Sequence, residues 1–78
     1  MPAAVRAALA ALESDIESRN YKITAIGKAD GSTEVTLTHK VSGNKWTGIG
    51  PRTSSFPYES ALKQANARMM AYETRFDS

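Results

Sequence analysis

Hydrophobic residues recur at helical spacing near the N-terminus of the chain. One apolar face is formed by Val5, Leu9, Leu12 and Ile16. Their separations of four, three and four residues match a 3.6-residue period, and the surrounding alanines favour a helix. Asn20 readily takes the left-handed conformation that ends helices. The pattern therefore predicts a helix over residues 3–18.

Two stretches in the middle of the chain alternate between apolar and polar residues, as half-buried strands do. These are residues 21–28, where the alternation is imperfect, and residues 32–41, where it is clean. The pair Asp30-Gly31 between them is a strong hairpin signal. In the second stretch we expect the core side to hold Val35, Leu37, His39 and Val41.

A second turn and a third strand are predicted to follow. Residues 42–44 read Ser-Gly-Asn, which is typical of a turn. Residues 45–49 alternate again, and Trp46 is expected to face the core. The three strands then form an antiparallel meander.

The stretch GIGPRTSS, residues 48–55, joins the third strand to a second helix. Its glycines lack the spacing of nucleotide-binding loops, and Pro51 has no backbone donor. Ser54 or Ser55 is expected to cap the helix that follows. We therefore expect a strand-to-helix turn, in which Arg52 could still hold a single backbone phosphate.

Helical periodicity returns in the C-terminal part of the chain. Residues 57–76 are predicted to form a helix with Pro57 in its first turn. Met69 and Met70 are adjacent, so only one of them is expected at the centre of the buried stripe. The expected stripe contains Tyr58, Ala61, Leu62, Ala65, Met69, Tyr72 and Phe76.

The predicted order is helix, three strands, helix, in a single domain over residues 1–78. Each helix has one apolar face, and so does the sheet. Placing both helices on the same face of the meander buries all three apolar faces. The sequence therefore predicts a two-layer α+β fold, αβββα. The opposite face is then open to solvent and is expected to carry Lys22, Thr24, Ile26, Lys28, Glu34, Thr36, Thr38, Lys40, Lys45 and Thr47.

The composition narrows the possible chemistry. The 78 residues contain no cysteine, so neither a disulfide nor a thiolate can form. His39 is the single histidine, with no nucleophile or acid predicted beside it, and no metal-ligand spacing occurs. The carboxylates expected on a solvated helix surface are Glu13, Asp15 and Glu17. We expect a protein without enzymatic activity, cofactor, metal or membrane segment, and a cytoplasmic location.

Positive charge is concentrated in the middle of the chain. The net charge is +2, whereas residues 21–52 hold five basic and two acidic side chains, a net charge of +3. Lysine suits phosphate, and threonine can contact bases or the backbone of nucleic acid. Lysine and threonine are also common on solvated sheets. The candidate nucleic-acid-binding residues are Lys22, Lys28, Lys40, Lys45 and Arg52.

The order of elements is similar to that of the double-stranded-RNA-binding domain over nearly the whole chain. The stretch GNKWTGIGPRTSSFPYESALKQANARMMA, residues 43–71, resembles the last strand, loop and second helix of that family. In that family, lysines at the start of this helix bind phosphates. The corresponding positions here hold Ser54, Ser55, Pro57, Tyr58 and Glu59. The resemblance therefore implies the fold but not the RNA contacts. Residues 21–76 are also similar in pattern to AP2-type and integrase-arm domains, which bind DNA through a three-stranded sheet.

Two classes of function remain open. The first is a nucleic-acid-binding module that uses the open sheet face and Arg52. The second is a protein-binding module, such as an adaptor or a small phage-encoded inhibitor of the anti-CRISPR kind, which docks its basic sheet on an acidic protein surface. A homodimer through the alanine-rich first helix is a further hypothesis, because small domains gain stability from self-association.

Overall fold

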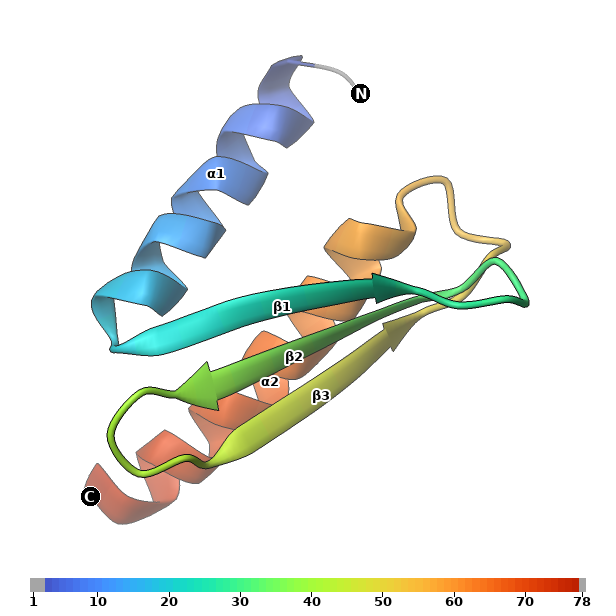
Figure 1. Cartoon of the computed structure of the whole chain (residues 1–78). Coiled ribbons are helices and arrows are strands. Elements are labelled where there is room, and N and C mark those ends of the chain that lie inside the picture. The colour runs from blue at the N-terminus through green and yellow to red at the C-terminus, as the bar shows by residue number, and fades with distance from the viewer. Residues whose placement is uncertain (1–2, 78) are drawn as a thin grey trace.

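The computed structural model describes the backbone of residues 3–77 and the side chains of residues 3–74. Its elements are α1 (Ala3–Ser18), β1 (Tyr21–Gly27), β2 (Thr33–His39), β3 (Lys45–Gly50) and α2 (Pro57–Asp77). Figure 1 shows one antiparallel sheet in the order β1-β2-β3, with α2 running behind it. Side chains of both helices share one core with the inner face of the sheet. The predicted two-layer α+β fold, αβββα, is confirmed.

The helix ends follow the sequence signals. Asn20 has a φ of 71°, and its N–H donates to the Glu17 carbonyl at 3.0 Å, so it ends α1 in the left-handed conformation as predicted. The second helix begins at Pro57, whose missing N–H would have had no partner in a first turn.

Residues 28–32 join β1 to β2, and a hydrogen bond between Lys28 and Ser32 leaves three residues in the loop itself. The Lys28 N–H donates to the Ser32 carbonyl at 2.8 Å, and Gly31 has a φ of 90° at the last loop position. The carboxylate of Asp30 accepts from the hydroxyl and the backbone N–H of Ser32, at 2.6 and 2.9 Å. These two bonds lower the pKa of Asp30. The predicted Asp-Gly hairpin is therefore present, with one more loop residue than the shortest turn has.

The strand β2 ends two residues earlier than the alternation predicts. The His39 carbonyl accepts from the Gly43 N–H at 2.9 Å, and its ring Nδ1 accepts from the Val41 and Ser42 N–H groups at 3.3 and 3.1 Å. The chain therefore turns at His39, and Lys40 lies in the turn. Val41 is 81% exposed, so its predicted place in the core is wrong.

The core lies between the inner sheet face and the two helices. Buried apolar side chains are Leu9, Ile16, Tyr21, Val35, Leu37, Ala61, Leu62, Ala65 and Met69. Met69 is fully buried and Met70 is partly buried, as their adjacency requires. Ala25 is exposed, because the far end of β1 is not covered by either helix. Phe76 lies outside the residues whose side chains the structure describes.

The second helix packs closely on β3 because two glycines of that strand have no side chain. A methyl group at Gly48 would overlap the Ala61 carbonyl oxygen, and one at Gly50 would overlap the Pro57 carbonyl oxygen. Both glycines are buried. Their role is therefore close backbone approach between strand and helix, which is one of the positions where glycine occurs in strands.

Two side chains of α2 cover the free edge of β3. The Ile49 N–H donates to Gln64 Oε1 at 2.7 Å, and the Arg68 guanidinium donates to the Thr47 carbonyl. Gln64 and Arg68 are four residues apart and so lie on the same side of the helix. One outward N–H and one outward C=O at the centre of this edge are therefore paired.

Candidate nucleic-acid interface on the open sheet face

Three rows of side chains cross the sheet face that the helices leave uncovered. The strand register fixes their membership. The row at one end consists of Lys22, Thr38 and Lys45. The middle row consists of Thr24, Thr36 and Thr47, and the row at the other end of Ile26, Glu34 and Ile49. The strand residues expected on this face therefore do share it.

The first row, with the adjacent turn, forms a lysine end of the face. Lys22 and Lys45 lie on the two outer strands and are exposed, with the half-buried Thr38 between them. Two strand spacings place their Cα atoms about 10 Å apart. Lys40 is exposed in the turn beyond β2, and its N–H donates to the Asn20 carbonyl at 2.9 Å. Among the described residues, no ion pair involves these three lysines.

The middle row offers hydroxyl groups. Thr36 and Thr47 lie on neighbouring strands with their Oγ1 atoms 3.4 Å apart, and both side chains are half-buried. Each hydroxyl can donate or accept toward a molecule that lies on the sheet. Because β-branched side chains on a strand have few rotamers, these groups are held in nearly fixed positions.

The far row differs in chemistry from the lysine end. Lys28 lies just beyond β1, and its Nζ is 2.9 Å from the Glu34 carboxylate. The hydrogen bond to Glu34 raises the pKa of Lys28. Ile26 and Ile49, on either side of Glu34, are 53% and 39% exposed. This end of the face is therefore apolar around a neutralised ion pair.

Arg52 lies at the same end of the sheet as Lys28. Its side chain passes beside Gly31 in the β1–β2 loop, and it lines a shallow pocket with Asp30 and Thr53. The length of β1 separates this end from Lys22 by about 20 Å. The structure therefore divides the five candidate cations into two groups: Lys22, Lys40 and Lys45 at one end, and Lys28 and Arg52 at the other.

The loop before α2 is held by its own hydrogen bonds. The Ser54 N–H donates to the Pro51 carbonyl at 3.0 Å, and Ser54 Oγ accepts from the Phe56 N–H at 3.2 Å. Ser54 Oγ also lies 3.1 Å from Ser60 Oγ in the first turn of the helix. The Ser54 hydroxyl therefore binds the N–H of Phe56, the residue that precedes α2, and not an N–H of the first helical turn as the predicted cap would. The loop is the expected strand-to-helix turn.

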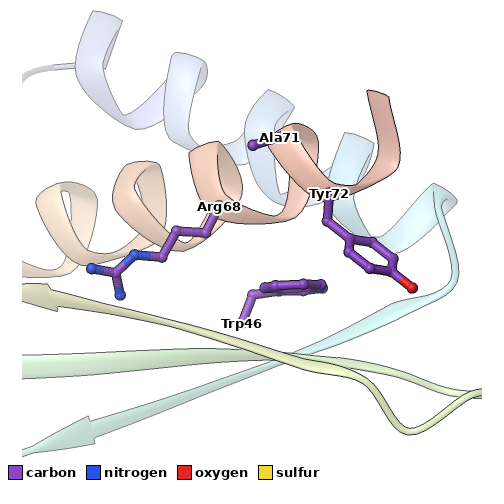
Figure 2. Close-up of a pocket in the computed structure, with 4 residues that line it drawn as sticks. All are labelled: Trp46, Arg68, Ala71 and Tyr72. Atoms are coloured by element: carbon purple, nitrogen blue, oxygen red, sulfur yellow. The ribbon is translucent and has the colours of Figure 1, made fainter. Parts of the chain in front are cut away.

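The aromatic side chains belong to the helix side of the sheet. Figure 2 shows a shallow pocket in which Arg68 and Tyr72 of α2 lie on opposite sides of Trp46. The rings of Trp46 and Tyr72 are 4.8 Å apart and tilted by 43°. Arg68 extends away from the Trp46 ring toward the edge of β3. This pocket is separate from the open face, whose described strand residues include no aromatic side chain.

Two tyrosine–carboxylate pairs connect the elements, and sequence reasoning did not find them. The Tyr58 hydroxyl donates to Glu13 at 2.9 Å, and burial together with this bond raises the pKa of Tyr58 to about 12. The Tyr21 hydroxyl donates to Glu73 at 2.7 Å. The pKa of Tyr21 is raised, mainly by burial and also by this bond. The expectation of a purely solvated Glu13 is therefore wrong, and no local signal in the sequence marks either pair.

The remaining candidate groups have structural partners. The ring of His39 lies edge-on to that of Tyr21, with centroids 5.0 Å apart, and the Arg19 guanidinium is 3.2 Å from the Asp15 carboxylate. Within the described part of the chain, no group of three or more acidic, histidine or cysteine side chains could hold a metal ion. Neither helix, over its described residues, is long and apolar enough to cross a membrane.

The lysine end is the site whose geometry suggests a ligand. It combines exposed cations, which form no ion pair among the described residues, with hydroxyl groups on an uncovered sheet face. Comparison with known proteins finds no matching family model, no similar curated protein and no similar solved structure.

Proposed function

We propose that the protein is a binding module that holds the phosphate backbone of duplex DNA with the lysine end of its open sheet face. The observation that carries the proposal is the row Lys22–Thr38–Lys45, in which two exposed lysines on the outer strands flank a threonine on the central strand. Lys40 adds a third exposed cation in the turn beside them. No carboxylate among the described residues forms an ion pair with any of the three.

The width of this row suits a major groove. The two lysine Cα atoms are about 10 Å apart, and the major groove of B-DNA is about 12 Å wide. Lysines at the two sides can therefore extend outward to the phosphates that border the groove. Thr38 and Thr36 on β2 then face the base edges, where hydroxyl groups can donate or accept.

Duplex DNA suits this face better than the other nucleic acids. The major groove of A-form RNA is too narrow for side chains to read, and single strands are bound mainly by aromatic stacking. The resemblance to the double-stranded-RNA-binding domain supports the topology, but Ser54, Ser55 and Glu59 stand where that family has its phosphate-binding lysines. The proposal therefore places DNA on the sheet and not at the start of α2.

Fluorescence anisotropy with labelled duplex DNA tests the proposal. Affinity should fall steeply with salt, because each lysine–phosphate contact releases counterions. The double variant Lys22→Ala/Lys45→Ala should bind more weakly to all sequences and lower the slope of log affinity against log salt by about 2, or about 1 per lysine. Duplex RNA and single strands should bind more weakly than duplex DNA.

A matched control removes two lysines from elsewhere. Lys28 pairs with Glu34, and Lys63 pairs with Glu59 at 2.8 Å on α2. The variant Lys28→Ala/Lys63→Ala therefore changes the net charge equally but should keep the wild-type salt slope. Equal losses of DNA affinity in the two double variants would mean that only the total charge matters, and this result would reject the site. Flat titrations with every nucleic acid would reject nucleic-acid binding.

A protein partner is the second candidate, and the far end of the face favours it. Ile26 and Ile49 are both exposed large apolar residues, and they lie on either side of the Lys28–Glu34 pair. A partner that docks there would be captured by the wild-type protein and lost with Ile26→Ser/Ile49→Ser. The Lys22→Ala/Lys45→Ala variant should keep such a partner, so the two candidate functions give opposite results in the same pair of variants.

A further inference from the structure

The two edges of the sheet differ in how they are protected. At β3, Gln64 pairs with the outward N–H of Ile49 and Arg68 with the outward C=O of Thr47. Among the described residues, no side chain pairs with an outward backbone group of β1. The bonds from Lys28 N–H to Ser32 and from Lys40 N–H to Asn20 show that even-numbered positions of this strand bond to β2.

The odd-numbered residues of β1 therefore direct their N–H and C=O groups away from the sheet. Within the described residues, no hydrogen bond outside the β1–β2 pairing involves the backbone of Ile23, Ala25 or Gly27. Ala25 and Gly27 are exposed, and so are Thr24 and Ile26 between and beside them. An open strand edge of this kind is a ready template for another strand.

The first helix presents small residues on the same flank. Successive helix residues turn by about 100°, which places Ala4, Ala8 and Ala11 on the side of α1 opposite Glu13. Glu13 bonds to Tyr58 of α2, so this alanine stripe points away from α2 and past the β1 edge. All three alanines are exposed. Figure 1 shows α1 at the β1 side of the sheet, diverging from the strand toward the N-terminus.

We propose that β1 pairs antiparallel with β1 of a second copy of this chain, giving a two-fold symmetric dimer with one continuous six-stranded sheet. The pairing would satisfy the unpaired edge of both copies at once. It would also bring the two alanine stripes together on the helix side, where small residues permit helices to approach to about 8 Å. The unpaired edge carries the proposal, and the small residues of α1 leave room for it.

Charge, together with the number of outward groups that are paired, favours one register for this pairing. Alignment of Ala25 with Ala25 of the second copy would place Lys22 opposite Lys28, which like charges disfavour. Alignment of Thr24 with Thr24 of the second copy places Lys22 opposite Ile26 and pairs Ile23 with Ala25. The second register has no like charges opposite each other, and it uses the outward groups of every odd-numbered residue of β1.

Cysteine cross-linking tests the register in a chain that has no native cysteine. In the proposed dimer, Thr24→Cys places two thiols directly opposite each other, within reach of a disulfide. The matched control Thr47→Cys lies in the same row on β3. Mild oxidation should give a covalent dimer rapidly for Thr24→Cys and at least tenfold more slowly for Thr47→Cys. Equal rates would overturn the proposal.

Solution mass and one proline variant test the edge itself. Light scattering should give twice the chain mass of 8.4 kDa, with a fraction that rises with concentration. Ala25→Pro removes an outward N–H without removing a bond to β2, so it should give a folded monomer, whereas Ala25→Val should remain dimeric. A monomer at every concentration of the wild type, or a dimer that survives Ala25→Pro, would overturn the proposal.

Hydrogen exchange of the wild-type chain keeps the test independent of how well the proline variant folds. The amides of Ile23, Ala25 and Gly27 should exchange more slowly as the protein concentration rises. Exchange that does not depend on concentration would exclude pairing at this edge. Neither measurement requires DNA. Pairing at β1 would place Lys22 inside a sheet about 24 Å wide, which is wider than a major groove. The monomer is therefore the form that the proposed function places on DNA, and the two proposals can fail separately.

Discussion

At the scale of single residues, the structure depends on polar contacts that link distant parts of the chain. Tyr58 on α2 donates to Glu13 on α1, and Tyr21 on β1 donates to Glu73 on α2. Each pair joins two elements that also share the apolar core. Hydrogen bonds to charged acceptors are stronger than neutral ones. The first pair therefore helps to hold α1 against α2, and the second holds α2 against β1.

The Tyr58–Glu13 pair makes a prediction about alkaline pH. The pKa of Tyr58 is about 12 in the folded chain and near 10 when unfolded. The folded state therefore holds the proton more tightly, and this stabilisation is complete below pH 10 and lost as the pH rises through 12. Urea unfolding midpoints should fall over this range, and Tyr58→Phe should make the fall shallower while costing about 1 kcal/mol at pH 7.

A second variant separates the carboxylate from the burial of the ring. Glu13→Gln keeps an acceptor but removes the negative charge, so the absorbance titration of Tyr58 should move to lower pH. If Glu13→Gln leaves the titration unchanged, and Tyr58→Phe has the same pH dependence as the wild type, the pair is not the source of the shift.

At the scale of elements, the docking of α2 on β3 depends on Gly48. A methyl group there would overlap the Ala61 carbonyl oxygen and lie 2.6 Å from the Ala65 nitrogen. Gly48→Ala should therefore push the helix from the strand and lower the free energy of unfolding by about 2–3 kcal/mol. Urea denaturation monitored by circular dichroism measures this change.

Gly27 provides the control for the same substitution. No atom lies within 4 Å of a methyl group built there, and its φ is not in the left-handed region. Gly27→Ala should change the stability by no more than about 0.5 kcal/mol. Similar losses at the two positions would show that close packing against α2 is not what Gly48 provides.

The elements show which sequence signals determine structure. The first helix has the bounds that its period and Asn20 predict, because both signals are local. The end of β2 was missed, because alternation continues through Val41 while the bond from Gly43 N–H to the His39 carbonyl already turns the chain. The cover of the β3 edge by Gln64 and Arg68 depends on how α2 docks, which no local pattern encodes.

At the scale of the whole molecule, two layers leave one sheet face and one sheet edge free. The order of elements leaves one sheet face open, and the alternation of residues in each strand predicts which of them lie on that face. The separation of the candidate cations into two groups could not be predicted in this way. The candidate cations separate because Arg52 and Lys28 follow the ends of β3 and β1 that lie farthest from Lys22 and Lys45.

An NMR titration shows directly whether duplex DNA binds to the lysine end of the open face, as we propose. Duplex DNA is added to the isotope-labelled protein, and shifts of backbone amides are mapped on the sheet. We expect the largest changes at Lys22, Thr38, Lys40 and Lys45, with small changes over α2. Changes centred on the start of α2 or on Arg52, or no changes at all, would contradict the proposal.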